Sequence, residues 1–311
     1  MEIANINVLV WNVRGLNARS RRDSLRMLVA DSTASIVCIQ ETKLSVILPF
    51  LMAGMLGSSF LAFDYLPAAG TRGGILTACR SPAMSCGRVH AGRHSLTVSV
   101  QIQDHDMPWT LTNVYGPQPD IDKVEFLEEL RLVHSLASPM WIVVGDFNLI
   151  LRAAEKNTSN VNRRNIGRFR RFVDDVSLKE VYLHGRRYTW SNERQAPVMA
   201  QLDRVLVYTQ QVWHSVDQRI GCASLSPTAG SPFLDWWLLR RRSFLGASKK
   251  GFDTTFILVS WHIWKERNHR VFTGDTQRTP QQLAVAITEE AAIWCSAGAH
   301  CRYTIGWHFQ S

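Results

Sequence analysis

The feature that most constrains the fold is the apolar run at residues 141–148, which reads Trp-Ile-Val-Val-Gly-Asp-Phe-Asn. A run of this length that ends abruptly in polar residues predicts a buried core strand. Its C-terminal end delivers the carboxylate of Asp146 and the carboxamide of Asn148. The chain is therefore expected to build a buried sheet that presents polar side chains at one edge.

Three other apolar runs end in the same way. Residues 8–12 end in Asn12, residues 35–41 end in Glu41, and residues 110–115 end in Tyr115. If these strands and the run at 141–148 lie side by side, two acids, two amides and a phenol meet at one rim. Oxygen-rich groups of this kind suit a hard cation and a phosphate ester.

Composition adds limits on partner and compartment. The formal net charge of +9 and the pI near 9.5 favour an anionic partner. The six cysteines are scattered, without the paired spacing of a zinc site, which indicates a reducing compartment. The N-terminus lacks the basic region of a signal peptide, and no apolar run approaches the roughly 18 residues of a spanning helix. We expect a nuclear or cytoplasmic protein that does not bind a membrane.

Periodicity predicts the elements between the four runs. A helix near residues 20–31 should bury Leu25, Leu28 and Val29. The alternating stretch 95–103 predicts an antiparallel strand that turns into residues 109–115. A helix over 120–136 should turn five apolar residues inward, and residues 188–193 and 202–207 should form the last hairpin. Those five residues are Val124, Phe126, Leu127, Leu130 and Val133.

The densest positive charge follows the run at 141–148. Residues 155–171 include Arg163, Arg164, Arg168, Arg170 and Arg171. This segment lies just downstream of the candidate rim, so we expect it to contact a nucleic-acid backbone. A solvated helix face is the alternative. Phe169 and Phe172, which interleave with the arginines, are expected in the core.

Five motifs, taken together and in this order, resemble the endonuclease/exonuclease/phosphatase superfamily. The closer resemblance is to the apurinic-type endonuclease domain of plant LINE (non-LTR) retrotransposons, and it covers roughly residues 5–220. The five motifs are Trp11-Asn-Val-Arg-Gly-Leu16, Gln40-Glu-Thr-Lys43, Asn113-Val-Tyr-Gly-Pro117, Gly145-Asp-Phe-Asn148 and Leu202-Asp-Arg204. The closer resemblance adds Asn162-Arg-Arg164, Arg168-Phe-Arg-Arg-Phe172 and Gly185-Arg-Arg-Tyr-Thr-Trp-Ser-Asn-Glu193.

The resemblance implies an α+β fold, a DNase I-like four-layer α/β-β/α sandwich, that cuts a DNA phosphodiester with Mg²⁺ or alternatively Mn²⁺. It implies that Glu41 holds the metal with help from Asn12, and that Asp146 orients or deprotonates water. Asn148 and Tyr115 would hold the phosphate. DNA would be bound by Arg14 and by Arg163, Arg164, Arg168 and Arg171. No small-molecule cofactor is expected, and the sequence does not determine the oligomeric state.

One departure from the family concerns Asp203. A carboxylate early in an apolar strand is costly to bury without a partner. The resemblance implies that Asp203 is a catalytic residue that holds the histidine of a terminal Ser-Asp-His motif in place. Residues 223–233 read Ala-Ser-Leu-Ser-Pro-Thr-Ala-Gly-Ser-Pro-Phe instead. None of His184, His214 or His262 occupies the motif's position, although a fold could bring one near. We therefore expect a weakened or inactive nuclease. A non-catalytic nucleic-acid-binding remnant and a phosphatase for small phosphoesters are the alternatives.

The chain changes character after about residue 233. Trp261 and Trp264 lie in one predicted helix, over 252–272, and Thr279 and Pro280 open a second that ends near residue 297. This tail resembles the C-terminus of plant LINE polyproteins. The predicted organisation is a catalytic-type domain at 1–222, a junction at 223–233 and a helical, Trp-rich tail at 234–311, with the reverse transcriptase missing. A native helical appendage is the alternative.

Overall fold

The computed structural model describes residues 6–70, 72–103, 108–138, 140–181, 183, 185–208, 241–242, 246–272 and 280–296. By its internal contacts the chain divides into two compact units. The first consists of Met1–Asp174 and Leu183–Val207, and the second of Asp175–Tyr182 and Tyr208–Ser311. The predicted junction at 223–233 lies outside the described residues.

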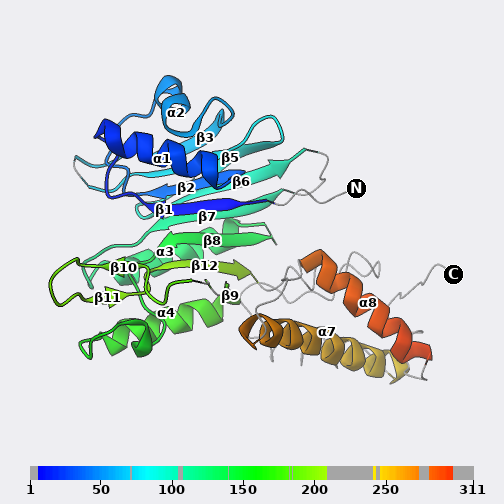
Figure 1. The fold of residues 1–311 in the computed structure, drawn as a ribbon. Helices are drawn as coiled ribbons and strands as arrows, with labels where there is room; N and C mark the ends of the chain where they lie inside the picture. Colours follow the sequence, from blue (N-terminus) through cyan, green and yellow to red (C-terminus); the bar gives the residue numbers. More distant parts are fainter. Residues whose placement is uncertain are drawn as a thin grey trace. The chain divides into compact units, whose positions relative to one another are not determined.

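The first sheet has four strands in the order β1-β2-β4-β3 (Figure 1). They are β1 (Val8–Asn12), β2 (Ile36–Gln40), β4 (Ile75–Cys79) and β3 (Ala62–Leu66). β1 and β2 are parallel, whereas β4 pairs antiparallel with both of its neighbours. Parallel neighbours need a crossover connection, and helix α1 (Arg19–Asp31) makes it. The ends of β1 and β2 therefore lie at the same edge of the sheet.

Five strands of the second sheet lie in the first unit, in the order β5-β6-β7-β8-β12. β7 and β8 are parallel and are joined by helix α3. The other pairs are antiparallel. The bounds are β5 (Met84–Ala91), β6 (Ser95–Ile102), β7 (Trp109–Tyr115), α3 (Lys123–Leu136), β8 (Trp141–Asp146) and β12 (Asp203–Tyr208).

The four apolar runs do not lie side by side in one sheet. They form two parallel pairs in different sheets, β1 with β2 and β7 with β8. Each pair has its own crossover helix, and a crossover helix covers one face of its sheet. The opposite faces are left to pack against each other. The polar strand ends therefore meet across the gap between two sheets rather than along the edge of one.

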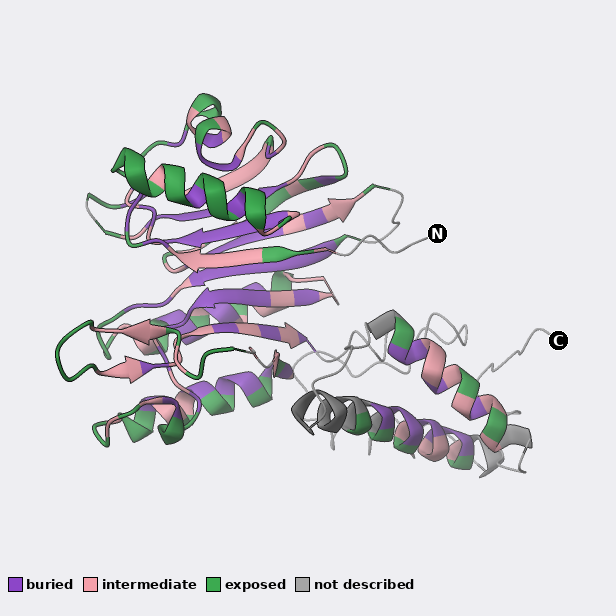
Figure 2. Cartoon of the chain, viewed as in Figure 1, coloured by how far each residue is buried: buried purple, intermediate pink, exposed green. Residues whose placement is uncertain are grey.

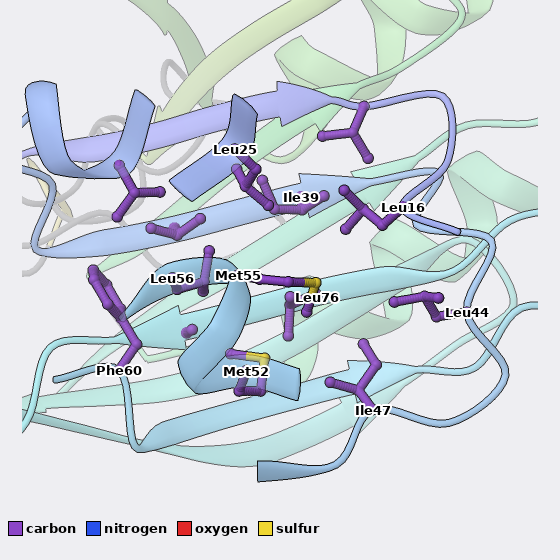
Figure 3. Close-up of a cluster of buried hydrophobic side chains, with 14 of the residues drawn as sticks. Leu16, Leu25, Ile39, Leu44, Ile47, Met52, Met55, Leu56, Phe60 and Leu76 are labelled. Atoms are coloured by element: carbon purple, nitrogen blue, oxygen red, sulfur yellow. The ribbon is translucent and has the colours of Figure 1, made fainter. Parts of the chain in front are cut away.

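The residues of β2 divide between two cores because alternate side chains of a strand point to opposite faces. All five are buried. Ile36 and Cys38 pack in the cluster that joins the two sheets. Val37 and Ile39 pack in the cluster beneath α1 and α2 (Pro49–Leu56). Figure 3 shows Ile39 in this second cluster with Leu25 and Met55 from the helices.

The outer faces complete the four predicted layers. α1 and α2 cover the first sheet. α3 buries Phe126, Leu130 and Val133, and its His134 ring lies 5.3 Å from the ring of Trp141 on β8. Helix, sheet, sheet and helix therefore follow one another, and burial is concentrated in the strands (Figure 2). The expected α+β sandwich is confirmed.

Three local expectations are wrong. Leu28 and Val124 are 38% and 41% exposed, because each lies at the border of a buried helical stripe that is narrower than predicted. The last hairpin also differs. β10 (Trp190–Ser191) pairs with β11 (Met199–Ala200), while β12 pairs antiparallel with β8. A local pattern does not show that the later strand finds a partner far away in the sequence.

Between β8 and β10 the chain forms η1 (Ala153–Glu155), α4 (Arg163–Asp175) and β9 (Leu178–Val181). In the second unit, α7 (Gly246–Phe272) and α8 (Pro280–Ser296) are the two helices expected of the tail. Their buried residues include Phe252, Leu258, Leu283 and Ile287. No helix in the described part of the chain is long and apolar enough to span a membrane.

Candidate active site

The ends of the two parallel pairs meet at one polar rim. Asn12, at the end of β1, donates from Nδ2 to Asp146 Oδ2 at 2.9 Å and so joins the two sheets. Tyr115 and Asp203 are the register partners of Asp146 on the strands to either side. Four predicted site residues from four strands are therefore brought together.

Asp146 is the most enclosed acid of the rim, with 4% of its surface exposed. Its Oδ1 accepts the backbone N–H of Asn148 at 2.9 Å, and its Oδ2 accepts from Asn12. Burial, and then the charge of neighbouring Asp203, raise the pKa of Asp146 to about 6. A carboxylate whose pKa lies near neutrality is well matched to accepting and releasing a proton.

Glu41 directly follows β2, and the ammonium group of Lys43 lies beside it. Lys43 Nζ lies 3.1 Å from Glu41 Oε1, and the Glu41 side chain is 18% exposed. Burial, and then the charges of Glu41 and Asp146, raise the pKa of Tyr115 well above its ordinary value. A hydrogen bond to Glu41 adds to the shift. The phenol therefore remains a hydrogen-bond donor at neutral pH and bonds to Glu41, next to the charge of Asp146.

Asp203 has a partner that the sequence did not indicate. Burial raises the pKa of Asp203, while a hydrogen bond from the Thr189 hydroxyl and the charge of Arg14 lower it. The same hydroxyl oxygen accepts the backbone N–H of Asp203 at 3.0 Å. Thr189 is therefore a hydrogen-bond partner of Asp203 that differs from the histidine implied by the resemblance. Thr189 lies 14 positions earlier in an irregular stretch, where no pattern marks it.

The rim concentrates unusual backbone conformations. Arg14, Glu41, Lys43 and Asn148 have φ values of 52°, 56°, 56° and 49°. Such left-handed conformations cost non-glycine residues of order 1–3 kcal/mol each and persist where the surroundings enforce them. At Asn148 two hydrogen bonds hold the left-handed conformation: its Nδ2 donates to Gly116 O at 2.7 Å, and its backbone N–H donates to Asp146 Oδ1. These strained residues lie at or just after strand ends, so the surrounding fold fixes the directions in which their side chains enter the rim.

Arg14 follows β1 and spans the side of the rim. Its Nη1 lies 2.9 Å from Glu193 Oε1, and its Nη2 donates to the carbonyl oxygen of Ser191 at 3.3 Å. These contacts tie the guanidinium to the end of β10, and 43% of the side chain remains exposed. Arg14 therefore lies beside the rim with its charge paired to Glu193.

The other predicted DNA-binding residues lie on α4. Arg163, Arg164 and Arg171 are exposed, while Arg168 is half-buried and donates to Asn165 Oδ1 at 3.3 Å. Phe169 and Phe172 are fully buried, as expected.

The start of α4 is anchored to the loop that follows β7. Asn162 and Asn165 each donate to a carboxylate oxygen of Asp120 at 2.8 Å. Asp120 lies between β7, which ends at Tyr115, and α3. The basic helix is therefore fixed to the same loop that begins at the rim.

The donor set of the rim fits a hard divalent cation. Mg²⁺ is usually held by one or two carboxylates together with waters and substrate phosphates, and Glu41 and Asp146 are carboxylates of that kind. The described residues contain no group of three or more His, Cys, Asp or Glu that could hold a metal ion. Asn12 Oδ1 accepts the N–H of Arg14 at 3.2 Å, so it shares its oxygen with the backbone.

Of the three histidines considered in the sequence, one, His262, lies in the described part of the chain. His262 is 4% exposed and lies on α7, where its Nε2 is 2.9 Å from Glu290 Oε2 of α8. His184, His214 and residues 223–233 lie outside the described residues.

Two facing sheets covered by helices, with acids and amides at the strand ends, define a DNase I-like phosphoesterase fold. Residues 9–224 match the Endonuclease/Exonuclease/phosphatase family, and the chain belongs to it. Members of this family are Mg-dependent phosphodiesterase hydrolases.

Two solved structures illustrate the shared fold. One is the endonuclease domain of TRAS1, a telomere-specific non-LTR retrotransposon, with 14% identity, a TM-score of 0.51 and coverage of 67% of this chain and 87% of that one. The other is the AP endonuclease LMAP from Leishmania major, with 18% identity, a TM-score of 0.54 and coverage of 66% and 79%. No curated protein sequence matches this chain.

Proposed function

We propose that the chain is a Mg²⁺-dependent DNA endonuclease domain of LINE retrotransposon origin, weakened or inactive because the terminal Ser-Asp-His motif is absent. The observation that carries the proposal is the contact between Asn12 and Asp146, which gathers the polar ends of two sheets into one rim. Family membership supports phosphodiester chemistry. The likeness to the TRAS1 endonuclease domain supports the fold.

Each residue of the rim has a separate role in the proposed reaction. Glu41 and Asn12 would hold Mg²⁺ or Mn²⁺, which when bound supplies positive charge for the oxygens of the reacting phosphate. Asp146, with a pKa near 6, orients the attacking water and accepts its proton. Tyr115 and Asn148 donate hydrogen bonds to phosphate oxygens. The charge of Asp203 adds to burial in raising the pKa of Asp146.

DNA would be held by Arg14 at the rim and by the α4 arginines beyond it. Nucleic-acid backbones are extended, and several separated cations suit them better than they suit a small phosphoester. This favours DNA over the phosphatase alternative. The tail at 234–311 would be a remnant of the LINE polyprotein C-terminus, joined at 223–233, and the protein would reside in the nucleus or cytoplasm.

A non-catalytic nucleic-acid-binding remnant is the second candidate. The hydrogen bond between Thr189 and Asp203 favours it. A hydroxyl holds the carboxylate but carries no positive charge, so it does not replace an imidazole that would stabilise a phosphate. Loss of one such stabilising group commonly lowers a rate by about 100- to 1000-fold.

Nicking of supercoiled plasmid in Mg²⁺ tests the proposal. We compare the parent with a variant in which Ser-Asp-His is inserted after Ser226, each with and without Glu41→Gln. The inserted motif is expected to raise nicking about 100-fold or more, and Glu41→Gln is expected to abolish it. Equal, Glu41-dependent nicking by both proteins would show that the motif is dispensable. Nicking by neither would favour the remnant.

The salt dependence of DNA binding tests the basic helix. Arg164→Gln together with Arg171→Gln should reduce the slope of log K against log salt by about two, since each phosphate contact contributes close to one. The control is Arg19→Gln with Arg93→Gln, two exposed arginines outside α4. Equal slopes for the two double variants would make α4 only a solvated face.

A further inference from the structure

Two buried amides connect the sheets directly beneath the rim. Gln40 of β2 donates from Nε2 to Asn113 Oδ1 of β7 at 2.6 Å. Asn113 Nδ2 in turn donates to Leu76 O at 3.0 Å and lies 3.2 Å from Thr77 Oγ1, both on β4. Gln40, Asn113 and Thr77 are fully buried. The bridge therefore joins two strands of the first sheet to one strand of the second.

The bridge lies immediately behind the candidate ligands. Gln40 precedes Glu41, and Asn113 is two residues before Tyr115, on the same face of β7. Gly145, which precedes Asp146, leaves space for the bridge. A Cβ at Gly145 would lie 2.3 Å from Val114 O and 3.2 Å from Gln40 Nε2.

Stability alone does not account for this pair. Gln40 Oε1 is buried without a hydrogen-bond partner among the described residues, and an unpaired buried acceptor costs free energy. Apolar residues of the same volume often stabilise a core at least as well as buried polar groups, and the best-attested advantage of the polar groups is register. The apolar contacts around the bridge are non-directional. Hydrogen bonds are directional and oppose sliding of one sheet over the other.

We propose that Gln40 and Asn113 are positioning residues whose amide bridge fixes the end of β2 against the end of β7, so that Glu41 faces Tyr115 and Asp146 in the arrangement a divalent cation requires. This inference rests on the proposed metal site at Glu41. It adds two residues that touch neither metal nor substrate.

The main test is the double variant Gln40→Met/Asn113→Leu, which replaces both amides by apolar side chains of similar size. It should melt within a few degrees of the parent or above it, yet bind Mn²⁺ at least tenfold more weakly by calorimetry. The matched control is Thr112→Val, at the residue of β7 that precedes Asn113. Thr112 Oγ1 lies 3.1 Å from Thr97 Oγ1 and accepts from Trp141 Nε1 at 2.8 Å, so the control also loses buried hydrogen bonds. It should lower the Tm while leaving Mn²⁺ affinity within twofold.

Hydrogen exchange gives a readout that does not need the metal. The N–H groups of Thr42 and Lys43 bond to Gly74 O and Gly73 O at 3.0 Å each, just past Glu41. In the double variant they should exchange about tenfold faster, while amides of β6 keep the parent's rates. Unchanged exchange at Thr42 and Lys43, or a uniform increase over all strands, would overturn the proposal.

The two hypotheses fail in different ways. If the parent shows no Glu41-dependent Mn²⁺ binding, the proposed function fails, and the exchange pattern still decides the positioning role. If the parent binds Mn²⁺ through Glu41 and the double variant keeps that affinity within twofold, the positioning role is wrong. Should the double variant not fold, Thr77→Val removes one hydrogen bond of the bridge. It is expected to weaken Mn²⁺ binding about threefold, and unchanged affinity would contradict the proposal.

Discussion

The ends of β2 and β8 carry one carboxylate each but hold it in opposite ways. Glu41 keeps a lysine ammonium 3.1 Å away, and part of its side chain reaches solvent. Asp146 is almost fully buried, accepts hydrogen bonds from neutral donors and has the acid Asp203 as its register partner. The surroundings of Glu41, at the end of β2, therefore favour a bound cation. Those of Asp146, at the end of β8, favour a bound proton.

The difference comes from the neighbouring strands rather than from the strand ends themselves. β2 lies between β1 and β4, and Glu41 faces Lys43 in the loop that follows. β8 lies between β7 and β12, which places Tyr115 and Asp203 on either side of Asp146. Similar strand endings acquire different chemistry because different side chains surround them.

The largest expected effect comes from removing the space next to Asp146. Gly145→Ala should destabilise the fold by about 3–5 kcal/mol, because Gly145 has a φ of 127° and an added Cβ would meet Val114 O at 2.3 Å. Urea unfolding measures the change. Gly87→Ala on β5 is the control, since a Cβ there meets no atom within 4 Å. Similar stabilities for the two variants would contradict the close packing at the Asp146 end.

A smaller effect follows from replacing the buried acid. The pKa of Asp146 in the folded state, about 6, lies above its ordinary value of 3.8. The folded protein therefore keeps a proton that the unfolded chain releases, and this stabilisation is lost as pH rises from about 4 through 6. Asp146→Asn carries no titrating carboxyl group, so its free energy of unfolding should not fall over this pH range. At pH 7 this is worth up to about 3 kcal/mol relative to the parent.

Urea unfolding between pH 4 and 8 measures this change. Glu41→Gln is the matched substitution at the other end. It breaks a partly exposed ion pair and should lower stability by no more than about 1 kcal/mol. Parallel stability curves for Asp146→Asn and the parent would show that the two carboxylates do not differ as described.

The smallest effect concerns the cation beside Glu41. Lys43→Met removes the charge that competes with a metal ion, so Mn²⁺ should bind about tenfold more tightly, equivalent to about 1.4 kcal/mol. Calorimetry measures the affinity. Lys123→Met changes the net charge equally but breaks an ion pair with Asp120 instead, and it should leave the affinity unchanged. Equal changes in both variants would reduce the effect to overall charge.

Some of the site could be predicted because its signals are local. An apolar run that stops at an acid or amide marks the end of a strand, and Asn12, Glu41, Tyr115 and Asp146 all lie at strand ends. Phe169 and Phe172, aromatic residues expected in the core, are also buried there. These features depend on residues a few positions apart, which a period of two or 3.6 reveals.

The tertiary structure alone decided which ends meet. Asn12 and Asp146 are 134 positions apart, and their contact depends on two sheets packing face to face. The same packing brings Gln40 to Asn113, whereas Thr189 reaches Asp203 beside the short β10–β11 pairing. The local sequence around a polar residue in an apolar strand is the same whether or not that residue has a hydrogen-bond partner in the fold. The sequence by itself determined which side chains stand at the strand ends, and the stacking of the sheets determined their neighbours, because hydrophobic burial specifies a face but not the residue opposite.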